Sequence, residues 1–169
     1  MQKNAHARNV RWVSTITLLI VLADQWTKKT FFIDYAFGPG WLTPLLRLTQ
    51  HKNKGIGFDL PLPTWLIFML SIFMILGILW MIILGCQQRE RTLCFSSAII
   101  LGGAIGNLFD RIAYGYVRDW LLLGGRSVIN LSDLAILFGC SWLFFFNGHV
   151  DKSPVMAKFR GSKEIIDTF

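Results

Sequence analysis

Residues 60–88, LPLPTWLIFMLSIFMILGILWMIILGCQQ, contain no charged side chain, although Asp59 and Arg89 stand directly at either end. A charge at the centre of a membrane-spanning helix costs about 2.5 kcal/mol or more, so charge-free stretches of this length mark spans. A span needs only about 20 residues, which leaves a surplus at the start of the stretch. We therefore predict a transmembrane helix that begins near Pro63 or Thr64, because proline is favourable in the first turn of a helix.

Three other stretches lack charges almost completely, namely residues 12–27, 92–109 and 134–150. The whole chain is 53% hydrophobic and only 16% charged, whereas soluble domains are about 25% charged. These features predict an all-α polytopic membrane protein with four transmembrane helices. Residues 1–150 would form the membrane domain, and residues 151–169 a basic cytoplasmic tail.

The first charge-poor stretch follows Lys3, Arg8 and Arg11, an order of basic and apolar residues that is also typical of a signal peptide. We interpret it as a retained span, because the apolar character resumes at Trp26. With four spans, slightly more Lys and Arg residues lie on the side of the two termini than on the other side. This small difference favours cytoplasmic termini.

The connection between the first two spans contains the helix breakers Gly38, Pro39, Gly40 and Pro44, followed by a run near residues 45–50 that is compatible with a β-strand. It predicts a small sheet or hairpin on the membrane surface.

The connection between the last two spans, VRDWLLLGGRSVINLSD at residues 117–133, places Asp119 and Asp133 at either end of an apolar segment. Gly124 and Gly125 interrupt this segment and are expected to reverse the chain. Such a turn could bring the two aspartates toward each other.

The net charge of +7 comes from 17 Lys and Arg residues that are spread over the termini and short loops. Without a basic stripe on one face, this distribution indicates contact with anionic lipid and not with nucleic acid. An odd number of cysteines argues against a disulfide framework or a zinc site. We interpret Cys86, Cys94 and Cys140, which lie in or beside apolar runs, as small core residues.

Polar residues gather at one edge of the predicted bundle. Asp24 lies near the end of the first span, Asp110 at the end of the third, and Asp133 at the start of the fourth. The same edge receives His51, Asn53, Asn107, Arg111, Asp119 and Asn130. Ionisable groups at a membrane are costly and indicate a functional site. These residues also have structural interpretations. An aspartate at a helix start, such as Asp133, can cap the helix. Arg111 could form an ion pair with Asp110 or bind a lipid phosphate.

The residue types at this edge favour carboxylate chemistry. The sequence has no histidine cluster for a metal, no glycine-rich phosphate loop, and no base at a telling spacing from Ser132. Two adjacent aspartates can hydrolyse an amide without a cofactor, since one stays ionised to activate water while the other keeps a proton and donates it. A small transporter or a docking subunit are alternatives, although neither an inverted repeat nor midplane charges are visible.

Five segments resemble, in order, the motifs of the bacterial lipoprotein signal peptidases, signal peptidase II. They are ADQWTK (23–28), HKNKGIGF (51–58), GGAIGNLFDR (102–111), VRDW (117–120) and INLSDLAI (129–136). The resemblance covers about residues 12–150, and GGAIGNLFDR is its most specific part. It implies a four-span peptidase of the bacterial cytoplasmic (inner) membrane, with cytoplasmic termini and a small extracytoplasmic β-cradle from the first long loop. The active site would lie at the extracytoplasmic face.

The resemblance also implies roles for individual residues. Asp119 and Asp133 would form a catalytic pair that cleaves diacylglyceryl-modified prolipoproteins just before the lipidated cysteine. The supporting and substrate-binding positions would be Asn53, Asn107, Asp110, Arg111 and Asn130. Asp24 would have a structural role. We expect no metal, no cofactor and no nucleic-acid partner. The protein is expected to be a monomer whose partners are its prolipoprotein substrates and membrane lipids.

The chain departs from the usual motifs of this family at three places. Residues 55–58 read GIGF where the family usually has Gly-Ala-Ala-Phe, residues 117–120 read VRDW where Val-Val-Asp-Phe is common, and Ser132 replaces a usual alanine. None of these changes removes a carboxylate. Arg118 could lower the pKa of its neighbour Asp119 or face lipid headgroups, and the altered cradle affects substrate preference more than reaction type.

Overall fold

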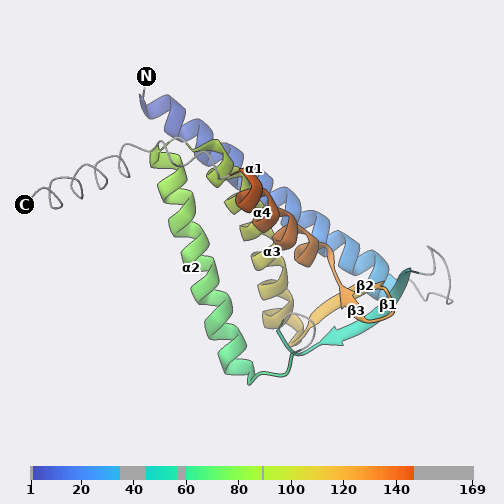
Figure 1. The fold of residues 1–169 in the computed structure, drawn as a ribbon. Helices are drawn as coiled ribbons and strands as arrows, with labels where there is room; N and C mark the ends of the chain where they lie inside the picture. Colours follow the sequence, from blue (N-terminus) through green and yellow to red (C-terminus); the bar gives the residue numbers. More distant parts are fainter. Residues whose placement is uncertain (1, 35–44, 57–59, 89, 147–169) are drawn as a thin grey trace, which may run out of the picture.

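The computed structural model describes residues 2–34, 45–56, 60–88 and 90–146, which form a bundle of four helices with a small sheet at one end (Figure 1). The helices are α1 (Gln2–Lys28), α2 (Thr64–Gln88), α3 (Arg91–Tyr114) and α4 (Leu131–Phe146), and the π-helix η1 (Lys29–Asp34) extends α1. Each of the four charge-poor stretches therefore overlaps a helix, although residues 147–150 of the last one lie outside the described residues, and α2 begins where the sequence predicts. The breakers at 38–44 and the tail at 151–169 lie outside the described residues.

Two of the described helices, α2 and α3, are long and apolar enough to cross a membrane, and α4 is a shorter apolar helix. On α2 most of the large apolar side chains are exposed, among them Phe73 at 77%, whereas Ile67 and Ile78 are buried against the protein. Apolar side chains exposed along a whole helix are the expected surface toward lipid. The number of four membrane crossings stays a prediction.

Helix α3 is the centre of the bundle and packs against α1, α2 and α4. Its close contacts depend on glycines, because a Cβ at Gly102 would lie 2.8 Å from Cβ of Ile20 on α1, and one at Gly103 would lie 2.5 Å from the backbone oxygen of Ser132 on α4. Small residues permit such close helix packing in membranes, where lipid gives no hydrophobic driving force and helices associate through van der Waals contacts and hydrogen bonds. Buried Ala98 continues this surface along α3.

The sheet contains β1 (Leu46–Asn53), β2 (Val117–Leu123) and β3 (Ser127–Ile129), all antiparallel and in the order β1-β2-β3. The expected small sheet therefore exists, but of its three strands in the described part of the chain, β1 alone comes from the first long loop. Gly124 and Gly125, with φ of 55° and 68°, form the turn between β2 and β3. The strands on either side of these glycines, β2 and β3, form a hairpin, and β2 pairs with β1. The expectation that the sheet comes from the first long loop alone was therefore wrong.

The cysteine prediction is confirmed for two of three residues. Cys86 and Cys94 are buried where α2 meets α3, with their sulfurs 3.5 Å apart. Cys140 is exposed on α4, so its interpretation as a core residue was wrong. Its helix lies at the edge of the bundle, and an apolar run does not reveal which of its faces meets the protein.

Candidate active site

Asp119 is fully buried in the middle of the sheet. Asn53 on β1 pairs with Val117, two residues before Asp119, so the side chains of Asn53 and Asp119 project from the same face. Nδ2 of Asn53 donates a hydrogen bond of 2.9 Å to Oδ2 of Asp119. Nδ2 of Asn130, which directly follows β3, donates one of 2.5 Å to Oδ1. Each carboxylate oxygen therefore accepts one bond from an amide.

Asp133 lies in the first turn of α4 and is partly exposed. Its backbone N–H donates to Oδ1 of Asn130 at 2.9 Å, and its Oδ2 accepts from the backbone N–H of Asn130 at 3.2 Å. This reciprocal arrangement is a capping box with Asn130 as the N-cap residue. The alternative that Asp133 caps its helix therefore applies to its Oδ2. Its Oδ1 accepts a separate hydrogen bond of 2.8 Å from Nδ2 of Asn107 on α3.

The amide of Asn107 has a defined orientation. Its Oδ1 accepts hydrogen bonds from Nδ2 of Asn130 at 3.2 Å and from Nζ of Lys28 at 3.0 Å. An ammonium group can only donate, so Lys28 requires the oxygen of Asn107 on its side. The amide nitrogen is then directed at Asp133, and the bonds link both aspartates through two asparagines.

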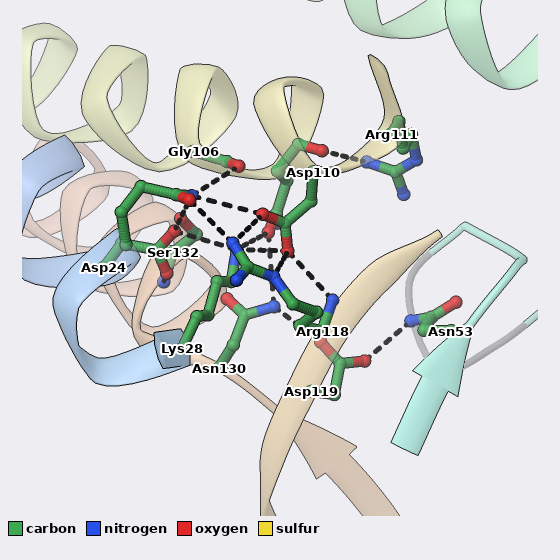
Figure 2. Close-up of polar contacts among 12 residues, drawn as sticks. Asp24, Lys28, Asn53, Gly106, Asp110, Arg111, Arg118, Asp119, Asn130 and Ser132 are labelled. Atoms are coloured by element: carbon green, nitrogen blue, oxygen red, sulfur yellow. Dashed lines mark hydrogen bonds and ion pairs between the residues drawn. The ribbon is translucent and has the colours of Figure 1, made fainter. Parts of the chain in front are cut away.

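A cluster of four buried charges lies behind these asparagines (Figure 2). Nζ of Lys28 is 2.8 Å from Oδ2 of Asp24 and 3.3 Å from Oδ2 of Asp110. Arg118 forms the second ion pair with Asp110, with 2.7 Å between Nη2 and Oδ1. Oδ1 of Asp24 accepts the backbone N–H of Ser132 at 2.9 Å, which ties the end of α1 to the start of α4.

The ion pairs differ from two expectations. Asp110 is paired with Arg118 and Lys28, whereas the proposed partner Arg111 donates to the backbone oxygens of Gly55 at 3.1 Å and Asn107 at 3.5 Å. The register of β2 brings residue 118 to the end of α3, a contact that the sequence spacing does not reveal. Arg118 is only 2% exposed, so the suggestion that it faces lipid headgroups was wrong.

Gly106 gives this region its close packing. A Cβ at this position would lie 2.6 Å from Oδ2 of Asp24 and would overlap Oγ of Ser132. Helix α3 can therefore approach both α1 and α4 only because residue 106 has no side chain. The approach brings Asn107, the next residue, to Asp133 and Lys28.

The environment of Asp119 raises the pKa of its carboxyl group. Burial raises the pKa of Asp119 to about 6, the charge of Asp133 adds to the increase, and the hydrogen bonds from Asn53 and Asn130 oppose it. A pair that shares one proton contains both an acid and a base. No group of three or more His, Cys, Asp or Glu residues within the described ranges could hold a metal ion.

The structure brings together all eight residues that the sequence analysis assigned to the site: Asp24, Asn53, Asn107, Asp110, Arg111, Asp119, Asn130 and Asp133. Three others were not selected. Lys28 is the i+4 neighbour of Asp24, a spacing that could have indicated the ion pair. Gln25 donates to Asp24 and Asp110. The only signal for Arg118 was its unusual position beside Asp119.

Fold and site together define a helical membrane protein with a cluster of carboxylates and amides at one end of its bundle. Two solved structures described as bacterial membrane enzymes share this fold, with TM-scores of 0.73 and 0.71 at 19% and 18% identity. These matches cover 86% and 83% of this chain and 93% and 94% of the solved chains.

The sequence comparisons give the family. The model of the family described as signal peptidase (SPase) II matches residues 16–147. A lipoprotein signal peptidase of Halalkalibacterium halodurans is 32% identical over 136 residues, which is 76% of this chain and 86% of the relative. One of Caldicellulosiruptor bescii is 35% identical over 140 residues, with shares of 80% and 89%. The chain belongs to the signal peptidase II family and is a membrane peptidase.

Proposed function

We propose that the protein is an aspartyl endopeptidase that removes signal peptides from diacylglyceryl-modified prolipoproteins and cleaves just before the lipidated cysteine. The observation that supports this most is the shared Asn130, which bonds to Asp119 and also caps the helix that carries Asp133. The side-chain amide of Asn130 holds the carboxylate of Asp119, and its backbone N–H holds the carboxylate of Asp133. Two carboxylates held by one residue form a unit that can share a proton. The names of the relatives, lipoprotein signal peptidase, supply the substrate class.

The proposed reaction uses the pair in both protonation states. The ionised aspartate takes a proton from a water molecule, whose oxygen attacks the scissile carbonyl carbon. The protonated aspartate donates its hydrogen to the carbonyl oxygen, which gives a tetrahedral diol. The other aspartate then passes the proton taken from water to the amine nitrogen as the C–N bond breaks, and the diol returns one hydroxyl proton to the first aspartate as the carboxylic acid forms. Every carboxylate oxygen of Asp119 and Asp133 accepts one bond from an asparagine. Each oxygen keeps a second lone pair for water or for the shared proton.

We further propose a four-span arrangement in the bacterial cytoplasmic membrane with both termini in the cytoplasm. Asp24 lies near the end of α1, Asp110 near the end of α3, and Asp133 at the start of α4. With alternating spans, all three positions fall on the extracytoplasmic side. A lipid-anchored substrate keeps its scissile bond near the headgroups, which is the depth of this site.

The test uses the purified full-length protein in lipid with a diacylglyceryl-modified prolipoprotein. We expect cleavage before the lipidated cysteine, and a loss of at least about 1,000-fold in Asp119→Asn and Asp133→Asn. Cleavage that either variant retains would disprove the pair. A parent protein without activity would favour a transporter or docking role, and inhibition by a chelator would indicate a metal.

A further inference from the structure

Arg118 is a buried cation directly before Asp119, and it holds strand β2 to helix α3. Its backbone N–H and its Nε donate to Oδ2 of Asp110 at 2.9 and 3.2 Å, and its Nη2 donates to Oδ1 at 2.7 Å. A guanidinium that bonds to both oxygens of a carboxylate fixes the geometry of the pair as well as its charge. The backbone on the N-terminal side of Asp119 is therefore anchored to α3.

The guanidinium of Arg118 also connects to a third element. Its Nη2 donates to Oε1 of Gln25 on α1 at 2.6 Å, and its Cζ lies 4.3 Å from the centre of the ring of Tyr114. Figure 2 shows the side chain extending from β2 toward Asp110, away from the side chain of Asp119. Neighbouring residues of a strand project to opposite faces, so Arg118 does not share the face of Asp119.

The charge of Arg118 balances the cluster behind the two aspartates. Asp24 and Asp110 are matched by Lys28 and Arg118. Lys28 lies closer to Asp24 and to Asn107, at 2.8 and 3.0 Å, than to Asp110 at 3.3 Å. Arg118 is the nearer cation of Asp110, at 2.7 Å. Without Arg118, the ammonium group of Lys28 would be the one cation of this cluster beside the carboxylates of Asp24 and Asp110, and the cluster would carry a net negative charge.

We propose that Arg118 is a positioning residue of this peptidase, which anchors the strand beside Asp119 and keeps the charge cluster behind the carboxylate pair neutral. This inference rests on the proposed function. Arg118 acts through Asp110 and not on the substrate. The ionisable groups that face the pair from the surrounding elements are Asp24 and Lys28 on α1, His51 on β1, and Asp110 and Arg111 on α3.

The experiment compares Arg118→Met with Arg126→Met, which removes the same charge from the exposed turn between β2 and β3. Cleavage of a lipid-modified prolipoprotein is measured against pH. For Arg118→Met we expect the alkaline limb of kcat/KM to move upward by about half a pH unit, because added negative charge favours the protonated pair. We also expect kcat to fall about tenfold, with KM changed less than about twofold. Arg126→Met should match the parent.

A second variant, Arg118→Met with Asp110→Asn, removes both charges of the pair. The new asparagine oxygen can still accept the backbone N–H of residue 118. We expect the alkaline limb to return to its parental position, whereas kcat stays low because the bidentate anchor is absent. In this variant the remaining charges of the cluster, Asp24 and Lys28, balance each other. The loss of the anchor can therefore still be measured if the single variant folds poorly.

Three outcomes would overturn the inference: a parental pH profile and kcat in Arg118→Met, a limb that stays shifted in the double variant, or a lower melting temperature as the sole effect. Failure of the proposed function is distinguished by the parent protein. A parent protein that does not cleave the prolipoprotein refutes the proposed function. If the parent is active and Arg118→Met has the same kcat and pH profile, only the role of Arg118 is refuted.

Discussion

Asn130 and Asp119 are joined by a hydrogen bond of 2.5 Å between the end of the β2–β3 hairpin and its first strand. The same asparagine accepts the backbone N–H of Asp133 and so begins α4. One side chain therefore sets the start of a helix and the orientation of the fully buried carboxylate of Asp119. Changes at Asn130 can separate these two tasks.

We expect Asn130→Ala to lose about 1 kcal/mol of stability through the missing cap and to lose about 100-fold in kcat, because Asp119 is no longer held in place. Asn130→Ser is the matched control. Serine is a good N-cap but has no amide to reach Asp119, so its melting temperature should recover while its activity stays low. An Asn130→Ser variant with parental kcat would show that the bond to Asp119 is dispensable.

The pH dependence follows from Asp119, whose pKa burial raises to about 6, with the charge of Asp133 as the second cause. Above that pH the pair loses its shared proton, so kcat/KM should fall with a limb centred near pH 6. The apparent pKa belongs to the pair and not to one residue. In Asp133→Asn the pKa of Asp119 should decrease, which an infrared titration of the carboxyl band can measure. An unchanged pKa would contradict the electrostatic coupling.

The same shift affects stability in a defined direction. Because the pKa of Asp119 is higher in the folded protein than in the unfolded chain, the folded state binds the proton more tightly. The stabilising contribution of this group is complete below about pH 4 and is lost as the pH rises through about 6. In Asp119→Asn this part of the pH dependence of the melting temperature should disappear.

The helices and the membership of the site could be predicted because charges are costly in a membrane. The stretch at 60–88 lacks charges and becomes α2, and every aspartate placed at the predicted edge lies in the site. Neither conclusion required knowledge of packing. The bond from Asn107 to Asp133 follows from their positions at the same end of α3 and α4.

The ion pairs and the strand order could not be predicted in the same way. Asp110 is followed directly by Arg111, but its partner is Arg118, because the pairing of β2 with β1 determines where residue 118 lies. Register depends on contacts between segments far apart in the chain. For the same reason, the sequence did not show that β2 and β3 complete the sheet begun by β1.

Lys28 offers a test of amide orientation. Its ammonium holds the oxygen of Asn107 and thereby directs the nitrogen at Asp133. We expect Lys28→Met to lower kcat by about tenfold or more, since the amide can then rotate and present its oxygen to a carboxylate. If Lys28 acts through Asn107, adding Asn107→Ala should cause little further loss in a double-mutant cycle. Lys29→Met, at an exposed neighbouring position, is the control.

Ser132 distinguishes carboxylate chemistry from a serine nucleophile. Its side chain is fully buried, and Oγ has no hydrogen-bond partner among the described residues. A buried hydroxyl without a partner costs about 1–3 kcal/mol, so Ser132→Ala should raise the melting temperature. The backbone bond to Asp24 is kept in alanine, and kcat should stay within about twofold of the parent because the hydroxyl has no step in the proposed reaction. A loss comparable to that of Asp119→Asn would show that the hydroxyl reacts and that the aspartates are not the sole reactive groups.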